Sequence, residues 1–476
     1  MTNALSVLMP GFAGPDLPGW LEALLRDGLG GVCLFATNIR SPEQTRRLTD
    51  AIRAANPRAV IAVDEEGGDV TRLHHATGSP YPGNALLGRL DDLDTTAEVG
   101  RSVARELRAA GIGLNFAPDA DVNSDPDNPV IGVRSFGADA DLVARHTASW
   151  IAAHEAEGVA TSAKHFPGHG DTAEDSHLAL PTVGADAATL DARDLPPFEA
   201  AVRAGARTVM SSHILVPALD DVPATFSRRI LGGVLRERLG FEGAIVSDAL
   251  DMRGASGDLG LAGAAVAAVR GGCDLLCIGT DNTAEQVVAL ADALERQVGA
   301  GRLEEAAERV ARLAISLAAP LGDSRDAPRT DPQPGFELAR DRVVGAFDVR
   351  PGLRIPEDAT RVALESAPNI AIGRTPWGLA AAGEGVSVVG PGDPLPGEGP
   401  WIVVGRAIHR HGALRAVAGE ARRRDPRTIA VDMGWPSPDR AYADIATFGA
   451  SRLVGRALAA LLDGRTGTGS PGPADR

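Results

Sequence analysis

Residues 159–181 read VATSAKHFPGHGDTAEDSHLALP, a short strand-like run that ends in a loop of lysine, histidines and aspartates. Comparable runs recur on both sides of it, and segments with the 3.6-residue periodicity of a helix separate most of them. The first two-thirds of the chain contain eight such runs: Leu5–Gly11, Gly30–Phe35, Ala59–Asp64, Gly113–Pro118, Val159–His165, Thr208–His213, Gly243–Asp248 and Asp274–Gly279. Strands that alternate with helices predict a parallel sheet, and eight of them are the number that closes into a (β/α)8 TIM-type barrel.

The remainder of the chain predicts a second, smaller α/β domain. Its expected strands are Arg361–Glu365, Val386–Val389, Trp401–Gly405 and Thr428–Asp432. A segment rich in proline, aspartate and arginine precedes it, and the last residues are small, polar and rich in glycine and proline. We therefore expect a barrel over residues 1–322, a linker and linking helix over 323–350, the α/β C-terminal domain over 351–463 and a disordered tail over 464–476.

Composition and charge narrow the classes of partner. The 476 residues contain 47 Lys+Arg against 63 Asp+Glu, and this net charge of −16 argues against nucleic acid or an anionic membrane as a partner. No apolar run reaches the roughly 18 residues that span a bilayer, and no basic leader opens the chain, so we expect a cytoplasmic protein. The three cysteines, Cys33, Cys273 and Cys277, lie in apolar runs and are predicted to be buried thiols.

Polar residues gather where the predicted barrel strands end. Such residues follow or close the third, fourth, fifth, sixth and seventh runs: Asp64, Asp119, Asp121, Lys164, His165, His213 and Asp248. A barrel builds its active site at the carboxyl ends of its strands, from several strands at once. The pattern therefore predicts where a site lies without defining its chemistry.

Three interpretations of the loop after the fifth run compete. His165 and His169 are spaced like metal ligands, but the proline and glycine between them prevent the helix that would place both on one face. His169 and Asp171 could instead satisfy buried backbone groups. Asp175 and His177 could form a carboxylate–imidazole pair in which the carboxylate fixes the tautomer and the free nitrogen exchanges a proton with a substrate.

The same loop carries a family resemblance. Its motif K-H-F-P-G-H-G-D-T-x-x-D-S-H, which begins at Lys164, resembles the signature of family 3 glycoside hydrolases, specifically their β-N-acetylglucosaminidases of the peptidoglycan-recycling type. Three further motifs match in the family's order: D-x-E-G-G-x-V-x-R at Asp64–Arg72, R-S-F at Arg134–Phe136 and S-D-x-L-x-M at Ser247–Met252. The similarity covers about residues 1–320.

The resemblance implies a role for each matched residue. Asp248 matches the nucleophile of a retaining glycosidase, His177 its acid/base and Asp175 the partner of that histidine. The positions that hold the sugar hydroxyls are matched by Asp64, Arg72, Arg134, Lys164 and His165. The implied reaction removes terminal GlcNAc from peptidoglycan fragments through a covalent glycosyl-aspartate, and it requires no metal or other cofactor.

Two positions depart from the family pattern. Glu65 stands where a glutamine is common, and Asp69 stands where an arginine is common. We expect these two extra negative charges near the mouth of the site, where they would alter the preference among anionic muramyl-type substrates.

Two other functions compete with hydrolysis. A phosphorylase would form the same intermediate and transfer the sugar to phosphate instead of water. A neutral histidine acid/base is compatible with this, because it does not repel incoming phosphate as a glutamate would. A catalytically silent sugar-binding regulator is the alternative from another class, although it would have no need of Asp248, Asp175 and His177 together. The C-terminal domain is interpreted as a packing or dimerisation module, and the sequence predicts no oligomeric state.

Overall fold

The computed structural model describes residues 4–173, 180–257, 259–318, 336–365 and 371–465. Residues 323–335 of the expected linker and residues 466–476 of the expected tail lie outside these ranges.

Eight parallel strands form the first sheet, in the order β1-β8-β7-β6-β5-β4-β3-β2. They are β1 (Leu8–Met9), β2 (Gly31–Leu34), β3 (Val60–Val63), β4 (Leu114–Asn115), β5 (Ala160–Phe166), β6 (Thr208–Ser211), β7 (Ala244–Ser247) and β8 (Leu275–Cys277). The amide of Cys33 in β2 donates to the carbonyl of Pro10, just after β1, at 3.0 Å, so the two edges of the sheet meet. The predicted barrel is confirmed, and each strand overlaps its expected run.

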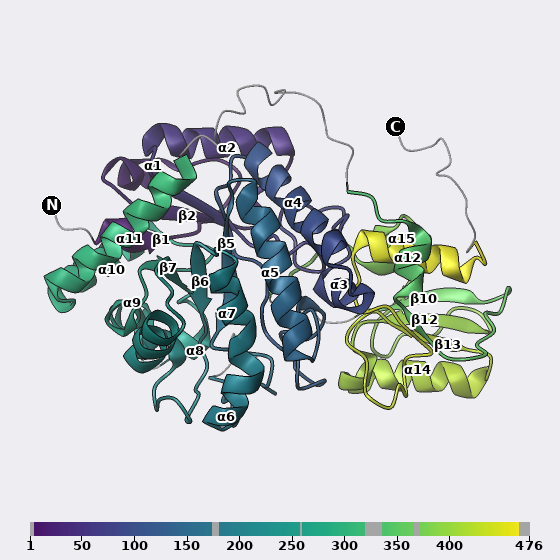
Figure 1. Cartoon of the computed structure of the whole chain (residues 1–476). Coiled ribbons are helices and arrows are strands. Elements are labelled where there is room, and N and C mark those ends of the chain that lie inside the picture. Colours follow the sequence, from purple (N-terminus) through teal and green to yellow (C-terminus); the bar gives the residue numbers. More distant parts are fainter. Residues whose placement is uncertain (1–3, 174–179, 258, 319–335, 366–370, 466–476) are drawn as a thin grey trace.

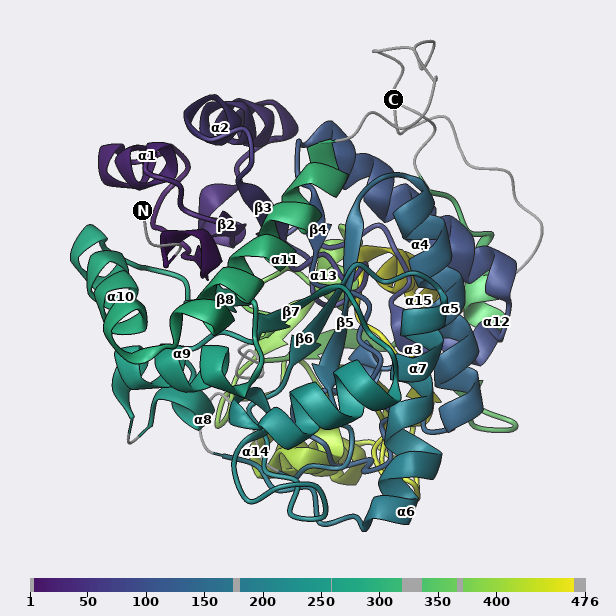
Figure 2. The same cartoon turned by 60° about the vertical axis from the view of Figure 1, so that its left-hand side comes forward.

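Helices surround these strands on the outside (Figures 1 and 2). The principal ones are α1 (Gly19–Arg26), α2 (Pro42–Ala55), α3 (Asn84–Leu90), α4 (Leu93–Ala109), α5 (Ala140–Ala156), α7 (Leu195–Arg203), α9 (Gly260–Gly271), α10 (Ala284–Gln297) and α11 (Ala300–Ala318). Helix α2 shows how the sequence sets such an element: Ser41 caps the amide of Gln44, proline occupies the first turn, and Leu48 and Ile52 face the core. In the part of the chain that the structure describes, no helix is both long and apolar enough to cross a membrane.

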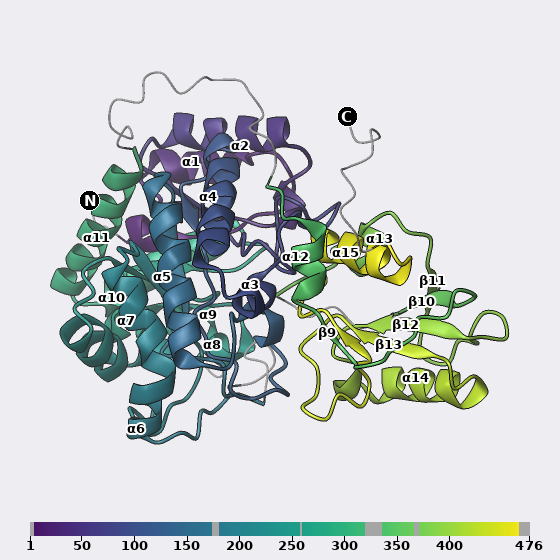
Figure 3. The ribbon, with the colours of Figure 1, turned by 45° about the vertical axis from the view of Figure 1, so that its right-hand side comes forward.

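The second sheet has six strands in the order β11-β10-β12-β13-β14-β9, all parallel except β9. They are β9 (Asp348–Val349), β10 (Thr360–Leu364), β11 (Ser387–Val389), β12 (Trp401–Gly405), β13 (Ile429–Asp432) and β14 (Ile445–Ala446). Figure 3 shows α14 (Gly412–Arg424) on one side of this sheet and α15 (Arg452–Leu462) on the other, with α13 (Gly378–Ala381) and α12 (Arg340–Gly345) nearby. The four expected strands are present, and β9 adds to the sheet from within the segment expected to be a linker.

The carboxyl ends of the two sheets face each other across the contact between barrel and second domain. Loops that follow β3 and β4 touch loops that follow β10, β12 and β14 through four polar contacts: Asp69 Oδ1 with Ala450 N (2.7 Å), Arg72 Nη2 with the Ala371 carbonyl (2.8 Å), Asn128 carbonyl with Arg410 Nη1 (2.7 Å) and Asp127 Oδ1 with His409 Nε2 (3.1 Å). Leu86 of α3 is fully buried in the second domain's apolar core. The end of the barrel that should hold the active site therefore lies against the second domain.

Candidate active site

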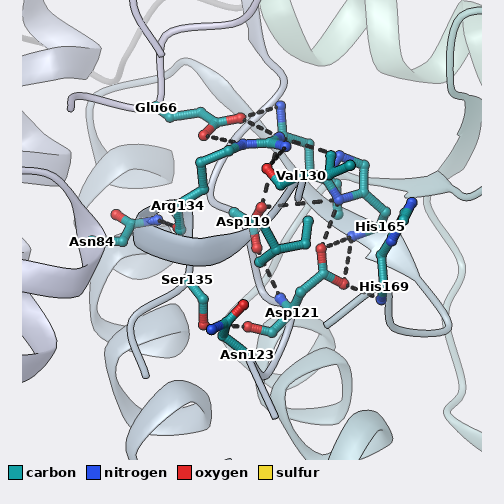
Figure 4. Close-up of polar contacts among 12 residues, drawn as sticks. Glu66, Asn84, Asp119, Asp121, Asn123, Val130, Arg134, Ser135, His165 and His169 are labelled. Carbon is teal, nitrogen blue, oxygen red and sulfur yellow. Dashed lines mark hydrogen bonds and ion pairs between the residues drawn. The ribbon is translucent and has the colours of Figure 1, made fainter. Parts of the chain in front are cut away.

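The sugar-binding residues that the sequence predicts come together at the carboxyl end of the barrel. Asp64 follows β3 directly, and Lys164 and His165 lie near the carboxyl end of β5. Arg134 is the last residue of the short 3-10 helix η3 (Gly132–Arg134), which follows β4. Figure 4 shows part of this cluster, with Arg134 lying between Glu66 and His165. Three separate barrel loops thus contribute to one polar network.

Glu66 is the centre of that network. Its carboxylate accepts two hydrogen bonds from the Arg134 guanidinium, at 3.0 and 2.8 Å, and lies 2.7 Å from Lys164 Nζ. The ammonium of Lys164 also donates to Asp64 Oδ1 at 2.7 Å. Burial raises the pKa of Glu66, but the charges of Arg134 and Lys164 outweigh it and hold that pKa below its ordinary value. Both cations are therefore held in fixed positions, and Lys164 lies directly beside the partly exposed Asp64.

His165 is held in one tautomer by its neighbours. Arg134 Nη2 lies 3.3 Å from its Nε2, and because a guanidinium only donates, Nε2 must accept. Its Nδ1 lies 2.7 Å from Asp121 Oδ2 and therefore donates. Both ring nitrogens are thus engaged by protein groups, which fits a role in binding better than one in proton transfer.

Asp119, Asp121 and His165 lie close enough together to hold a metal ion. However, Arg134 Nη2 is 3.6 Å from Asp119 Oδ2, and Asp121 already accepts from the side chain of His165 and the backbone of His169. Burial and the neighbouring Asp121 raise the pKa of Asp119 well above its usual range. Because the Arg134 guanidinium already lies beside Asp119, and Asp121 is already engaged by hydrogen bonds, the arrangement favours a sugar site over a metal site.

Arg72 connects the barrel site to the second domain. Its Nη2 lies 3.8 Å from Asp64 Oδ2 and donates to the carbonyl of Ala371 at 2.8 Å. The side chain keeps 12% of its surface exposed, and that of Asp64 keeps 19%. Both groups can therefore reach a ligand as well as each other.

Asp248 follows β7 directly and is half-buried. Its Oδ1 accepts from the amide of Ala249 at 2.7 Å, and the carbonyl of Ala249 lies 3.0 Å from His213 Nε2. The next helix, α8 (Arg253–Ser256), begins only at Arg253, so Asp248 is not its N-cap. Asp175 and His177, the predicted acid/base pair, lie outside the described residues, and their roles stay predictions.

The expectation that Glu65 and Asp69 charge the mouth of the site is wrong. Glu65 is fully buried, and its Oε2 accepts from the amides of Arg72 and Leu73, each at 2.9 Å. Asp69 turns toward the second domain and accepts from the amide of Ala450 at 2.7 Å. Burial raises the pKa of both carboxyls. They organise the loop and the domain contact instead of facing a substrate.

The structural interpretation of His169 and Asp171 fits their contacts. The amide of His169 donates to Asp121 at 2.7 Å, and its Nδ1 lies 2.8 Å from Thr172 Oγ1. Burial lowers the pKa of His169 to about 4, so the ring is neutral. Asp171 accepts from Arg193 at 2.8 Å. Both residues hold the described part of the loop that follows β5.

The family model of the glycosyl hydrolase family 3 N-terminal domain matches residues 20–313. This barrel with its polar site at the strand ends is therefore a glycoside hydrolase, and the chain belongs to glycosyl hydrolase family 3.

Similar proteins carry related names. A beta-hexosaminidase A from Pseudoalteromonas piscicida is 37% identical over 332 residues, which make up 63% of this chain and 55% of that relative. The structure of a family 3 beta-N-acetylglucosaminidase from Paenibacillus has a TM-score of 0.84 at 28% identity and covers 97% of this chain and 96% of that one. NagZ from Neisseria gonorrhoeae, solved in complex with N-trifluoroacetyl-D-glucosamine, has a TM-score of 0.55 at 33% identity and covers 66% of this chain and 98% of that one.

The Glu66 network yields a stability prediction. Replacing Glu66 by glutamine keeps the shape but leaves Lys164 and Arg134 with one buried negative charge fewer, which should lower the free energy of unfolding by about 3 kcal/mol. Urea unfolding followed by circular dichroism measures this. The matched control is Glu22→Gln, which removes an exposed partner of Arg26 and should change stability by less than about 0.5 kcal/mol. Equal stability of the two variants would contradict the network.

Proposed function

We propose that the chain is a retaining exo-β-N-acetylglucosaminidase that removes terminal GlcNAc from peptidoglycan-derived fragments in the cytoplasm. The observation that carries this proposal is the fixed set of donors and acceptors around Asp64, placed at the same end of the barrel as Asp248. The names of the similar proteins support the choice of sugar.

The network suits a neutral sugar. Lys164 and Arg72 can only donate hydrogen bonds, whereas Asp64 can only accept them when ionised. Because opposite charges already neutralise one another, a ligand with hydroxyl groups can exchange hydrogen bonds there without bringing a charge of its own. These donors and acceptors can distinguish sugars by the positions of their hydroxyl groups, and an enzyme that acts on a terminal sugar requires this selectivity.

In the proposed mechanism the carboxylate of Asp248 attacks the anomeric carbon while His177 donates a proton to the leaving oxygen. Asp175 keeps His177 in the correct tautomer and favours the imidazolium. Water then attacks the glycosyl-Asp248 ester, and His177 takes the proton from that water. The second inversion restores the β-configuration and frees Asp248.

The test is a panel of nitrophenyl β-glycosides assayed with and without phosphate, with NMR of the first product. We expect cleavage of the GlcNAc glycoside well above the glucoside, and β-GlcNAc as the first product, because two inversions retain configuration. Release of α-GlcNAc first would contradict the covalent mechanism. In phosphate, β-GlcNAc 1-phosphate in place of free sugar would identify a phosphorylase. Sugar-dependent thermal stabilisation without turnover would identify a binding protein.

A further inference from the structure

The second domain contains a cavity of about 660 Å³ that the reaction in the barrel does not use. It lies at the carboxyl ends of β10 and β12, and the loop of residues 373–380 completes its wall. Figure 3 shows these strands beside α13, which belongs to that loop. We call this space the sheet-end cavity; its volume is typical of small-molecule sites.

The path of the chain singles out this position. From β10 the chain moves to β11 on one side of β10, and from there it crosses to β12 on the other side. The strand order therefore reverses between β10 and β12. In open parallel sheets, ligands bind in the crevice that such a reversal leaves at the carboxyl ends of the strands.

The charged groups around the cavity have few partners within the protein. Arg374 and Glu365 are exposed, and in the described part of the chain neither side chain has a hydrogen bond or an ion pair. Arg406 stacks 4.8 Å over the ring of Trp377, and its positive charge also interacts with the buried carboxylate of Asp69 at the domain contact. A guanidinium pairs readily with a planar carboxylate, so the exposed Arg374, with the positive charge of Arg406 at the same cavity, points to a carboxylate ligand.

The rest of the wall is suited to an apolar group. Val388 is 65% exposed, although it is a large apolar side chain, and it lines the cavity together with Leu379 and the ring of Trp377. The carboxylate of Glu365 lies at the same cavity and disfavours a ligand that carries only negative charge. A matching ligand has a carboxylate, a cationic group and an apolar portion.

We propose that the sheet-end cavity binds an amino acid or a short peptide. Arg374 would hold its carboxylate, with Arg406 adding positive charge at the same cavity, Glu365 would hold its ammonium group, and Trp377 and Val388 would contact its apolar side chain. This would be a second ligand site, separate from the sugar site, so it does not depend on which sugar the barrel cleaves.

Isothermal titration of the full-length chain with the dipeptide Ala-Val tests this proposal. We expect saturable binding at one site, and we expect the C-terminal amide of the same dipeptide to bind at least about tenfold more weakly, because the charge-assisted hydrogen bonds to the carboxylate are lost. N-terminal acetylation should also weaken binding, since it removes the charge that faces Glu365. Inorganic phosphate should bind more weakly than the dipeptide.

Variants separate this site from others on the chain. Arg374→Ala should weaken dipeptide binding at least about tenfold without unfolding the protein, because the side chain is exposed and has no hydrogen bond or ion pair among the described residues. Arg423→Ala, an exposed arginine on α14, is the matched control and should leave binding unchanged. Asp248→Asn should also bind the dipeptide normally. No saturable binding up to about 10 mM, unchanged binding by Arg374→Ala, or displacement of the dipeptide by GlcNAc would overturn the proposal.

Discussion

Replacing Asp248 by asparagine is expected to lower kcat on a GlcNAc glycoside at least about a thousandfold, because the amide cannot form the covalent intermediate. The fold should persist, since the asparagine oxygen can still accept from the amide of Ala249, as Asp248 Oδ1 does at 2.7 Å. Steady-state kinetics together with circular dichroism measure both effects.

Asp281→Asn is the control for this variant. Asp281 is an exposed carboxylate in the loop after β8, at the same end of the barrel, and the same chemical change there should leave kcat within about twofold. If Asp248→Asn keeps more than about a tenth of the original activity, Asp248 is not the nucleophile.

Replacing His177 by alanine should cost about a hundredfold or more in kcat/KM on substrates with poor leaving groups. An activated nitrophenolate departs with little protonation, so the same variant should retain much more of its activity on nitrophenyl GlcNAc. A plot of log kcat/KM against the pKa of the leaving group should therefore become much steeper in the variant.

Asp175→Ala should steepen the same plot by a smaller amount, because it removes only the control of the His177 tautomer. The comparison between leaving groups acts as an internal control for folding, since a partly unfolded sample loses activity equally on all substrates. Equal loss across the series would assign His177 to binding or structure instead of proton transfer.

The barrel could be predicted from sequence because most of its strands are short, predominantly apolar runs that protein covers on both faces. Strands β9 and β14, of two residues each, were not predicted, whereas the equally short β1 and β4 lie within the longer runs Leu5–Gly11 and Gly113–Pro118 that were. The helix α14 was also missed, although it buries Leu414, Val417 and Ala421 at helical spacing. That pattern was available in the sequence.

The location of the site could be predicted from the sequence, but the hydrogen bonds and ion pairs within it only in part. Glu66 stands inside the quoted D-x-E-G-G motif, yet it was given no role; the signal was that two cations expected inside the barrel require buried acids. The orientation of Glu65 and Asp69 could not be read from their position in the motif. Adjacent residues of a loop can face a core, a second domain or a ligand. For Asp69, only the hydrogen bond from the amide of Ala450 shows that the side chain faces the second domain.

The central claim is that the sugar becomes covalently attached to Asp248. The most direct measurement is to trap that ester with a fluorinated GlcNAc donor that has a good leaving group, and to locate the added mass by peptide mass spectrometry. Fluorine slows both the formation and the hydrolysis of the ester, because it destabilises their oxocarbenium-like transition states. The good leaving group makes formation faster than hydrolysis, so the ester accumulates. We expect one sugar per chain, attached to Asp248 and absent from Asp248→Asn. Attachment to another residue, or turnover of the donor without any labelled peptide, would contradict it.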